Sequence, residues 1–423
     1  MINTAPLLAL LACSLVSPTV ARPATADWAQ WRGPNRDGVS PESGLLKEWP
    51  ASGPRLLWKA TGLGGGYSGP AIAAGRIYLG GYVGQDDVVW ALEETTGKQV
   101  WTAKVGPIPK ATGPGQSIDR NDGPRGTPTI DGDRLYMLGA GGRLVCLETT
   151  TGKESWRKEF AADLGGQMMS RWGYAESVLV DGDRVVCTPG SPKGTVAALD
   201  KRTGTVLWQS GALTDKAAYS SIVIGNPAGV RQYVVFTDQH VAGISPADGK
   251  VLWQASRPGK TAVIPTPIVQ GDEVFVTSGY GIGCNLFKVS KPADALAVTE
   301  VYASRDLVNH HGGVVLFGDH LYGHSDARGW VCMEFTTGKV VWADRGVGKG
   351  SVTFADGHLY CRSEGSAGTI ALVEATPKGY VEKSRFDQPD RSSKNSWPHP
   401  VIADGKLYLR DQDVLLCYDV KTK

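Results

Sequence analysis

The segment Thr150-Thr151-Gly152-Lys153-Glu154-Ser155-Trp156 is one of five copies of a short phrase that ends in tryptophan. The other copies end, in chain order, at Trp101, Trp208, Trp253 and Trp342. The five tryptophans are separated by 55, 52, 45 and 89 residues. The last interval is about twice the one before it, which predicts a degenerate copy in between, with Tyr302 in place of the tryptophan. A period of this length is typical of a repeat architecture.

Each repeat also opens with two short β runs that are separated by a glycine-containing turn, as in Pro128–Tyr136. Such a pair predicts a β-hairpin. A third β run follows, and a fourth leads into the tryptophan, so each repeat has the four antiparallel strands of a propeller blade. The opening hairpins predict eight blades, which begin near Pro70, Thr127, Ser177, Ser221, Thr266, Gly313, Ser351 and Pro400.

The eighth repeat reaches Thr422-Lys423 without a fourth strand, whereas Gly53–Trp58 resembles a fourth strand without a repeat of its own. We therefore expect an all-β fold: an eight-bladed β-propeller of four-stranded antiparallel blades, closed by an N-terminal strand. Closure leaves no open sheet edge between the first and last blades. The propeller would span residues 53–423, and residues 27–52 would form an N-terminal strap packed on it.

Residues 1–26 have the pattern of an export signal. Leu7 to Val16 is an apolar core, and Ala24-Thr25-Ala26 is a small-x-small cleavage site, although no Lys or Arg precedes the core. An alternative is a lipoprotein signal in which Cys13 is lipidated. Either reading predicts a periplasmic or secreted protein. No later stretch has the ~20 apolar residues that a transmembrane helix needs.

Charge gives little indication of a partner. The chain has 44 basic and 42 acidic residues, for a net charge of +2, and no basic run stands out. Nothing therefore favours a nucleic-acid partner. We expect a monomer that binds a small-molecule or protein ligand.

Five repeats share the pattern small-x-acidic-x-x-Thr-Gly-x-x-x-Trp, with Ser245 in place of the acidic residue and Asp248 in place of the Thr in one of them. This pattern resembles the tryptophan-docking motif of the quinoprotein dehydrogenases, which belong to the PQQ-like β-propeller repeat family. It also resembles the outer-membrane assembly factor BamB, a non-enzymatic relative. The opening Asp27–Gly38 is similar to the start of many secreted bacterial proteins of this family. The repeat alignment makes Cys146, Cys332 and Cys417 small buried residues, and Cys187 and Cys361 are interpreted in the same way, which argues against most disulfides. The alignment leaves Cys284 unexplained.

Residues just before the first strand of each blade should meet at one mouth of the central channel. These positions are polar and aromatic, as a small-molecule site requires. Arg and Lys could hold an anion, and a His could act as a general base. The candidate binding residues are Tyr67, Arg125, Arg171, Trp172, Glu176, Tyr219, His310, His311, Lys349, Trp397 and His399.

Two functions follow from these observations. The first is an exported binding or scaffold module, favoured because the docking pattern is present without the vicinal cysteine pair of alcohol-oxidising quinoproteins. The alternative is a dehydrogenase of alcohols or sugars that uses pyrroloquinoline quinone and calcium. In that case the resemblance implies Glu176 as a calcium ligand, Arg125 or Lys349 on the quinone oxygens, and a His as the proton acceptor.

Overall fold

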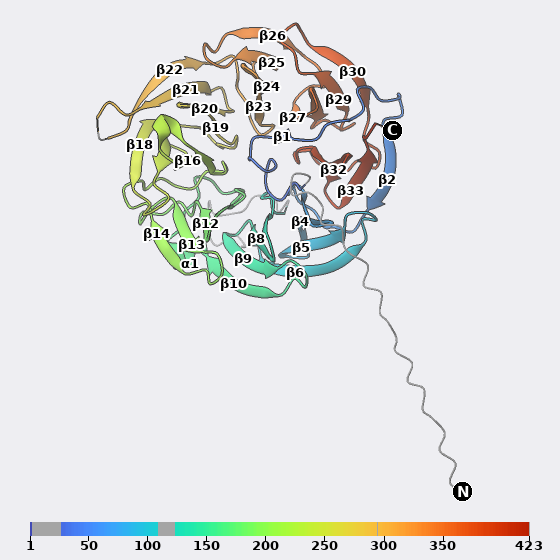
Figure 1. Cartoon of the computed structure of the whole chain (residues 1–423), viewed down its shortest axis with the longest axis horizontal. Coiled ribbons are helices and arrows are strands. Elements are labelled where there is room, and N and C mark those ends of the chain that lie inside the picture. The colour runs from blue at the N-terminus through green and yellow to red at the C-terminus, as the bar shows by residue number, and fades with distance from the viewer. Residues whose placement is uncertain (2–26, 109–122, 294, 423) are drawn as a thin grey trace.

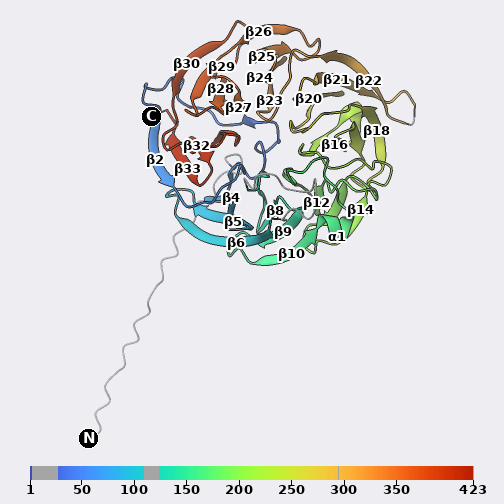
Figure 2. The same ribbon diagram turned by 180° about the vertical axis from the view of Figure 1, so that it is seen from behind.

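The computed structural model describes residue 1 and residues 27–108, 123–293 and 295–422. The predicted export signal and Cys13 lie outside the described residues. Within the described ranges, eight antiparallel sheets stand around a central axis and form a disc (Figures 1 and 2). The first strand of each sheet lies nearest the axis, and the fourth lies at the rim. The predicted eight-bladed, all-β propeller is confirmed.

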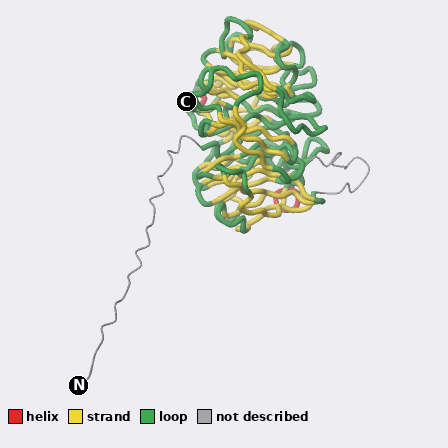
Figure 3. The backbone as a smooth tube through the Cα atoms, turned by 90° about the vertical axis from the view of Figure 1, so that its right-hand side faces the viewer, coloured by secondary structure: helices red, strands yellow, loops and turns green. Residues whose placement is uncertain are grey.

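The blades follow one another along the chain, and consecutive strands within each blade are antiparallel. Viewed edge-on, the described residues form a flattened body of strands and connecting loops with little helix (Figure 3). A single helical turn, α1 (Phe160–Leu164), follows blade 2, and a 3₁₀ turn, Pro227–Gly229, lies inside blade 4. Blades 1 to 4 contain β3 (Ala71–Ala73), β4 (Arg76–Val83), β5 (Asp86–Glu93) and β6 (Gln99–Pro107); β7 (Thr129–Asp131), β8 (Arg134–Leu138), β9 (Arg143–Glu148) and β10 (Glu154–Glu159); β11 (Leu179–Asp181), β12 (Arg184–Cys187), β13 (Ala197–Asp200) and β14 (Val206–Gln209); β15 (Val223–Gly225), β16 (Gln232–Phe236), β17 (His240–Ile244) and β18 (Val251–Ser256).

The second half of the ring repeats this arrangement, with two strands added from the N-terminal part of the chain. Blades 5 to 8 contain β19 (Ile268–Gln270), β20 (Glu273–Ser278), β21 (Gly283–Ser290) and β22 (Ala297–Ser304); β23 (Val314–Phe317), β24 (His320–Ser325), β25 (Gly329–Glu334) and β26 (Val340–Asp344); β27 (Gly350–Ala355), β28 (His358–Ser363), β29 (Ile370–Glu374), β30 (Val381–Phe386) and the added β1 (Val39–Ser40); β31 (Val401–Ala403), β32 (Lys406–Asp411), β33 (Val414–Asp419) and the added β2 (Arg55–Ala60).

The strand β2 closes the ring as predicted. It pairs antiparallel with β33, with Leu56 opposite Tyr418 and Trp58 opposite Cys417. Strand β1 was not predicted. It pairs in parallel with the innermost strand of blade 7, with Val39 opposite Phe354, and so makes a fifth strand in that sheet.

The repeated tryptophans join neighbouring blades. The indole of Trp101 lies over Gly152 of the next blade, and its Nε1 donates a 3.0 Å hydrogen bond to the carbonyl of Thr149. Gly152 has a φ of 72°, and a Cβ there would lie 2.7 Å from the indole, so only glycine fits this contact. Tyr302 occupies the tryptophan register in blade 5 and donates to Phe335 in the same way, which confirms the degenerate repeat.

The six cysteines from Cys146 onward are free and buried, as the repeat alignment predicted for all of them except Cys284. They contribute apolar surface to the clusters that lie within and between blades. No described helix is long and apolar enough to cross a membrane.

Candidate functional site

One face of the disc carries the predicted site residues. Strands alternate in direction within a blade, so the loop before its first strand and the loop between its second and third strands lie on the same side. We call this side the mouth face. All eleven candidate residues lie on loops that precede the innermost strands, as expected from the sequence.

Aromatic and basic side chains from these loops form a line of contacts. The His311 ring lies 5.6 Å from the Trp397 ring, which lies 4.4 Å from the ring of Tyr67. The guanidinium of Arg125 is 5.9 Å from the centre of the Tyr67 ring and donates a 2.8 Å hydrogen bond to the carbonyl of Trp172. The structure thus brings these five candidates together across the mouth.

A second group surrounds His310. Its Nδ1 lies 2.8 Å from Nζ of Lys349, which forms a 3.0 Å ion pair with Asp326. Its Nε2 lies 3.1 Å from the hydroxyl of Tyr280. Burial lowers the pKa of His310 to about 4, with a further contribution from the nearby His311 and Lys349. His310 is therefore neutral at pH 7 and accepts a hydrogen bond from the Lys349 ammonium.

Glu364 links the two groups. Its Oε2 lies 2.8 Å from Nε2 of His311 and accepts a 2.8 Å hydrogen bond from Nε1 of Trp397. Burial raises the pKa of this carboxyl, but the hydrogen bonds from His311 and Trp397 and the charges nearby outweigh burial and lower it to about 2. Glu364 is thus a permanent anion at the mouth.

Sequence reasoning missed Tyr280, Asp326 and Glu364. These residues lie on the loops between the second and third strands of their blades, which the sequence analysis did not examine. The same strand alternation that placed the candidates at the mouth could have identified them, because both sets of loops share a face.

The remaining four candidates differ in their exposure to solvent. Tyr219 is buried and pairs with the hydroxyl of Ser170, and Arg171 is exposed. His399 is buried, and its Nε2 donates a 3.0 Å hydrogen bond to the carbonyl of His311. Glu176 is also buried, and its Oε1 accepts a 2.6 Å hydrogen bond from the amide of Thr188. Burial raises the pKa of Glu176 to about 7 despite the charge of Arg36.

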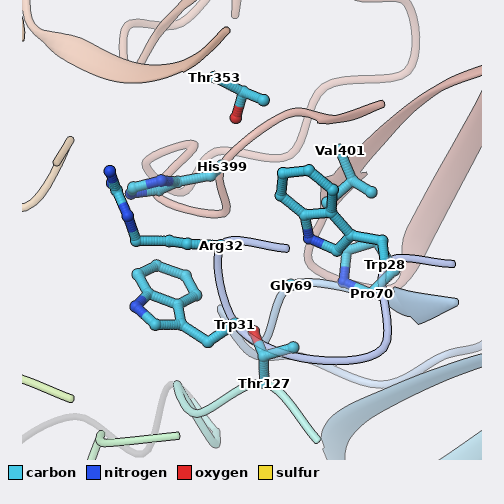
Figure 4. Close-up of a pocket in the computed structure, with 9 residues that line it drawn as sticks. All are labelled: Trp28, Trp31, Arg32, Gly69, Pro70, Thr127, Thr353, His399 and Val401. Atoms are coloured by element: carbon cyan, nitrogen blue, oxygen red, sulfur yellow. The ribbon is translucent and has the colours of Figure 1, made fainter. Parts of the chain in front are cut away.

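The N-terminal strap closes the channel beneath the mouth. In Figure 1 this blue segment reaches the centre of the disc. Trp31 lies 4.7 Å from the ring of His399, and Arg32 extends beside it (Figure 4). The cavity that remains here is about 10 Å³, which is no more than the space of one water molecule. Beside His399, therefore, the strap leaves no room for a ligand larger than water.

This arrangement does not fit a quinone and calcium site of the kind that the resemblance implies. Glu176 is enclosed, and one of its carboxylate oxygens is already bound to the backbone. Lys349 is paired with Asp326 and His310, and Arg125 with the carbonyl of Trp172. Among the described residues, no group of three or more His, Cys, Asp or Glu side chains could hold a metal ion. The structure therefore supports no step through such a cofactor.

Comparison with known families identifies the repeat. The sequence profile of the family described as outer membrane protein assembly factor BamB matches residues 39–120 and 85–344, which is more than half of the chain. The chain belongs to the BamB family of PQQ-like repeat proteins. A BamB from Salmonella typhimurium is 28% identical over 208 residues, which cover 45% of this chain and 48% of that protein. The chain spans about half the length of the curated BamB relatives it matches.

Solved structures show the same fold. BamB from Moraxella catarrhalis aligns with a TM-score of 0.59 at 15% identity, over 84% of this chain and 95% of that one. A quinohemoprotein alcohol dehydrogenase from Pseudomonas putida aligns with a TM-score of 0.53 at 11% identity, over 94% of this chain and 81% of that one. At these identities the likeness to BamB and to the dehydrogenase concerns the fold alone.

Proposed function

We propose that this protein is an exported, protein-binding scaffold of the cell envelope that uses the mouth face as its docking surface. The observation that carries the proposal is the combination of an aromatic and charged surface with a filled channel. A small-molecule site is normally a concave pocket that buries most of its ligand. Aromatic and arginine side chains are instead enriched in the cores of protein interfaces, and the charged groups around them suit the polar rim of such an interface.

Membership of the BamB family supports this function, because relatives in that family are named as assembly factors of the outer membrane. The export pattern of residues 1–26 agrees with a periplasmic or secreted location. The mouth face also offers an anchor of the kind that dominates protein interfaces, because Tyr280 is 40% exposed and is oriented by His310.

The test is site-specific photo-crosslinking in the source cell. A photoreactive residue replaces Tyr280 on the mouth face, and a matched control replaces Asp133, which lies on the opposite face and is 76% exposed at its side chain. We expect a discrete adduct with one envelope protein from position 280 and none from position 133. The proposal is overturned if position 280 gives no adduct, or if both positions give the same adducts.

A thermal-shift titration separates this function from the dehydrogenase. Pyrroloquinoline quinone and calcium should leave the melting temperature unchanged. A saturable rise that is lost in an Arg125→Ala, Lys349→Ala double variant would instead support the quinone-dependent enzyme.

A further inference from the structure

The segment Trp28–Ser40 enters the centre of the propeller as a loop of consecutive turns, with short stretches at both ends that pair with the blades. Its backbone pairs first with the innermost strand of blade 1, where the amide of Trp28 and the carbonyl of Ile72, and the amide of Ile72 and the carbonyl of Trp28, form two 2.9 Å hydrogen bonds. The carbonyl of Ala29 then accepts a 2.8 Å hydrogen bond from Ile130 of blade 2. At its other end, the carbonyl of Gly38 accepts a 2.9 Å hydrogen bond from the amide of Phe354 of blade 7.

Side chains of the segment contact further blades. Nε1 of Trp31 donates a 2.9 Å hydrogen bond to Oγ1 of Thr266, which precedes the first strand of blade 5. Nη2 of Arg32 donates to the carbonyl of Val314 in blade 6 at 2.6 Å. The hydroxyl of Ser40 donates to Ile402 of blade 8 at 2.9 Å. A segment of thirteen residues is thus recognised by seven blades, counting blade 3 through Arg36.

Blade 3 recognises the side chain of Arg36 specifically. Its Nη1 and Nη2 donate to the carbonyls of Val178 and Ser177 at 3.1 and 2.5 Å, and Nη1 also lies 3.1 Å from Oε1 of Gln30. The residue is only 3% exposed. Backbone carbonyls that converge on a guanidinium select arginine over lysine, because only a planar group reaches them together.

The channel wall offers more polar groups than the segment uses. In the wall, Nδ1 of His399 and Oγ1 of Thr127 are buried and lack hydrogen-bond partners within the described structure, and both residues line the small cavity in Figure 4. In the segment itself, Nε and Nη1 of Arg32 are likewise buried and unpaired. A buried polar group without a partner is unfavourable, because it loses its contacts with water and gains none in return. The wall is therefore a polar recognition surface that its occupant does not saturate, unlike the apolar packing inside each blade.

We propose that the centre of the propeller is a peptide-binding site, that residues 28–40 are its resident ligand, and that it takes peptides in which two tryptophans three residues apart are followed by arginine. This site lies directly beneath the mouth face, and His399 borders both. The proposal assigns a role in recognition to the Trp-x-x-Trp-Arg opening of the strap.

The first experiment uses the full chain with a protease site inserted after the exposed Ser43. After cleavage, the segment that ends at Ser43 should co-elute with the folded propeller in gel filtration at micromolar concentration. A labelled synthetic peptide of residues 27–43 should displace it in a saturable way. The peptide with Trp31→Ala and Arg32→Ala should bind at least tenfold more weakly, and the control peptide with Ser43→Ala should bind like the parent peptide.

The second experiment needs no cleavage. The full-length Trp31→Ala, Arg32→Ala variant has a weakened resident segment and should bind the labelled peptide at least tenfold more tightly than the unaltered protein does. The proposal is overturned if the cleaved segment elutes free while the propeller remains folded and takes up no labelled peptide. It is also overturned if the doubly substituted peptide competes as well as the parent peptide.

Discussion

The backbone amide of Trp49 donates a 3.0 Å hydrogen bond to the hydroxyl of Ser384. Ser384 lies opposite Leu372 at the β-bulge of blade 7, which is the register that tryptophan or Tyr302 holds in other blades. Trp49 fills the missing position from outside the repeat: its ring lies 5.7 Å from that of Tyr360, compared with 5.9 Å between Trp101 and Tyr78 in blade 1. The strap thus packs an indole at the place in blade 7 that has no tryptophan of its own, although Nε1 of Trp49, unlike that of Trp101, has no hydrogen-bond partner within the described residues.

Replacing Trp49 should therefore destabilise the whole propeller. We expect Trp49→Ala to lower the free energy of unfolding by about 3–5 kcal/mol, as is typical of a large buried aromatic residue. Ser384→Ala removes one hydrogen bond and should cost about 1 kcal/mol. Urea denaturation followed by circular dichroism measures both. Equal effects of the two substitutions would contradict the docking role of Trp49.

The contact between Gly152 and Trp101 can be tested with a matched glycine. Gly75 has nearly the same φ, 75°, but a Cβ there would meet no atom within 4 Å. Gly75→Ala should cost about 1–2 kcal/mol from backbone strain alone. Gly152→Ala should cost about 1–3 kcal/mol more, because the added methyl group displaces the indole. Denaturant midpoints of the two variants provide the comparison.

Much of this architecture could be predicted because each repeat is defined by short sequence patterns. The Thr-Gly turn and the tryptophan lie in one short phrase, and Gly53–Trp58 carries the same strand pattern as the blades it closes. The role of Trp49 could not be predicted, because its partner Ser384 is more than 300 residues away and neither residue belongs to a motif. The mouth was predicted only in part: the loops before the innermost strands gave Tyr67 and Trp397, and strand alternation could also have placed Glu364 on this face, but its contacts with His311 and Trp397 depend on the meeting of separate loops.

Glu176 should make the stability of the fold decrease with pH. Burial raises its pKa from 4.5 to about 7, so the folded state holds the proton more tightly than the unfolded state. The contribution of Glu176 to the free energy of unfolding is about 3 kcal/mol. It is fully present below about pH 4.5 and is lost as the pH rises through 7. Glu176→Gln mimics the protonated form. The variant should gain stability relative to the parent between pH 5 and 8, and a constant difference across this range would refute the assignment.

Two buried histidines, His324 and His399, and the half-buried His310 have the opposite effect on the pH dependence of stability. Burial lowers the pKa of His310 and His324 to about 4 and that of His399 to about 3, below the ordinary 6.5. The contribution of these histidines to the free energy of unfolding is fully present above pH 6.5 and is lost as the pH falls through 4. In NMR titrations the ring signals of His399 should not move between pH 7 and 4.5. A midpoint near 6.5 would show that the ring is solvated and that the strap does not cover it.

The buried cysteines predict chemical inertness. Burial raises the pKa of Cys187 and Cys361 well above 9, so their thiolates are scarce. A thiol reagent such as 5,5′-dithiobis(2-nitrobenzoic acid) should label none of the six cysteines from Cys146 to Cys417 in the native protein and all six in denaturant. Rapid labelling without denaturant would mean that the blades separate locally.

The pairing of β2 with β33 also determines the order in which the molecule can be made. A growing chain presents Arg55–Ala60 before the first blade, but its partner Val414–Asp419 comes more than 350 residues later. The edge of β2 is therefore unpaired throughout synthesis, and an exposed strand edge of this kind promotes association with other chains. The protein can complete its fold only after translation of the last blade, and we infer that cells must keep the nascent chain apart from its neighbours until then.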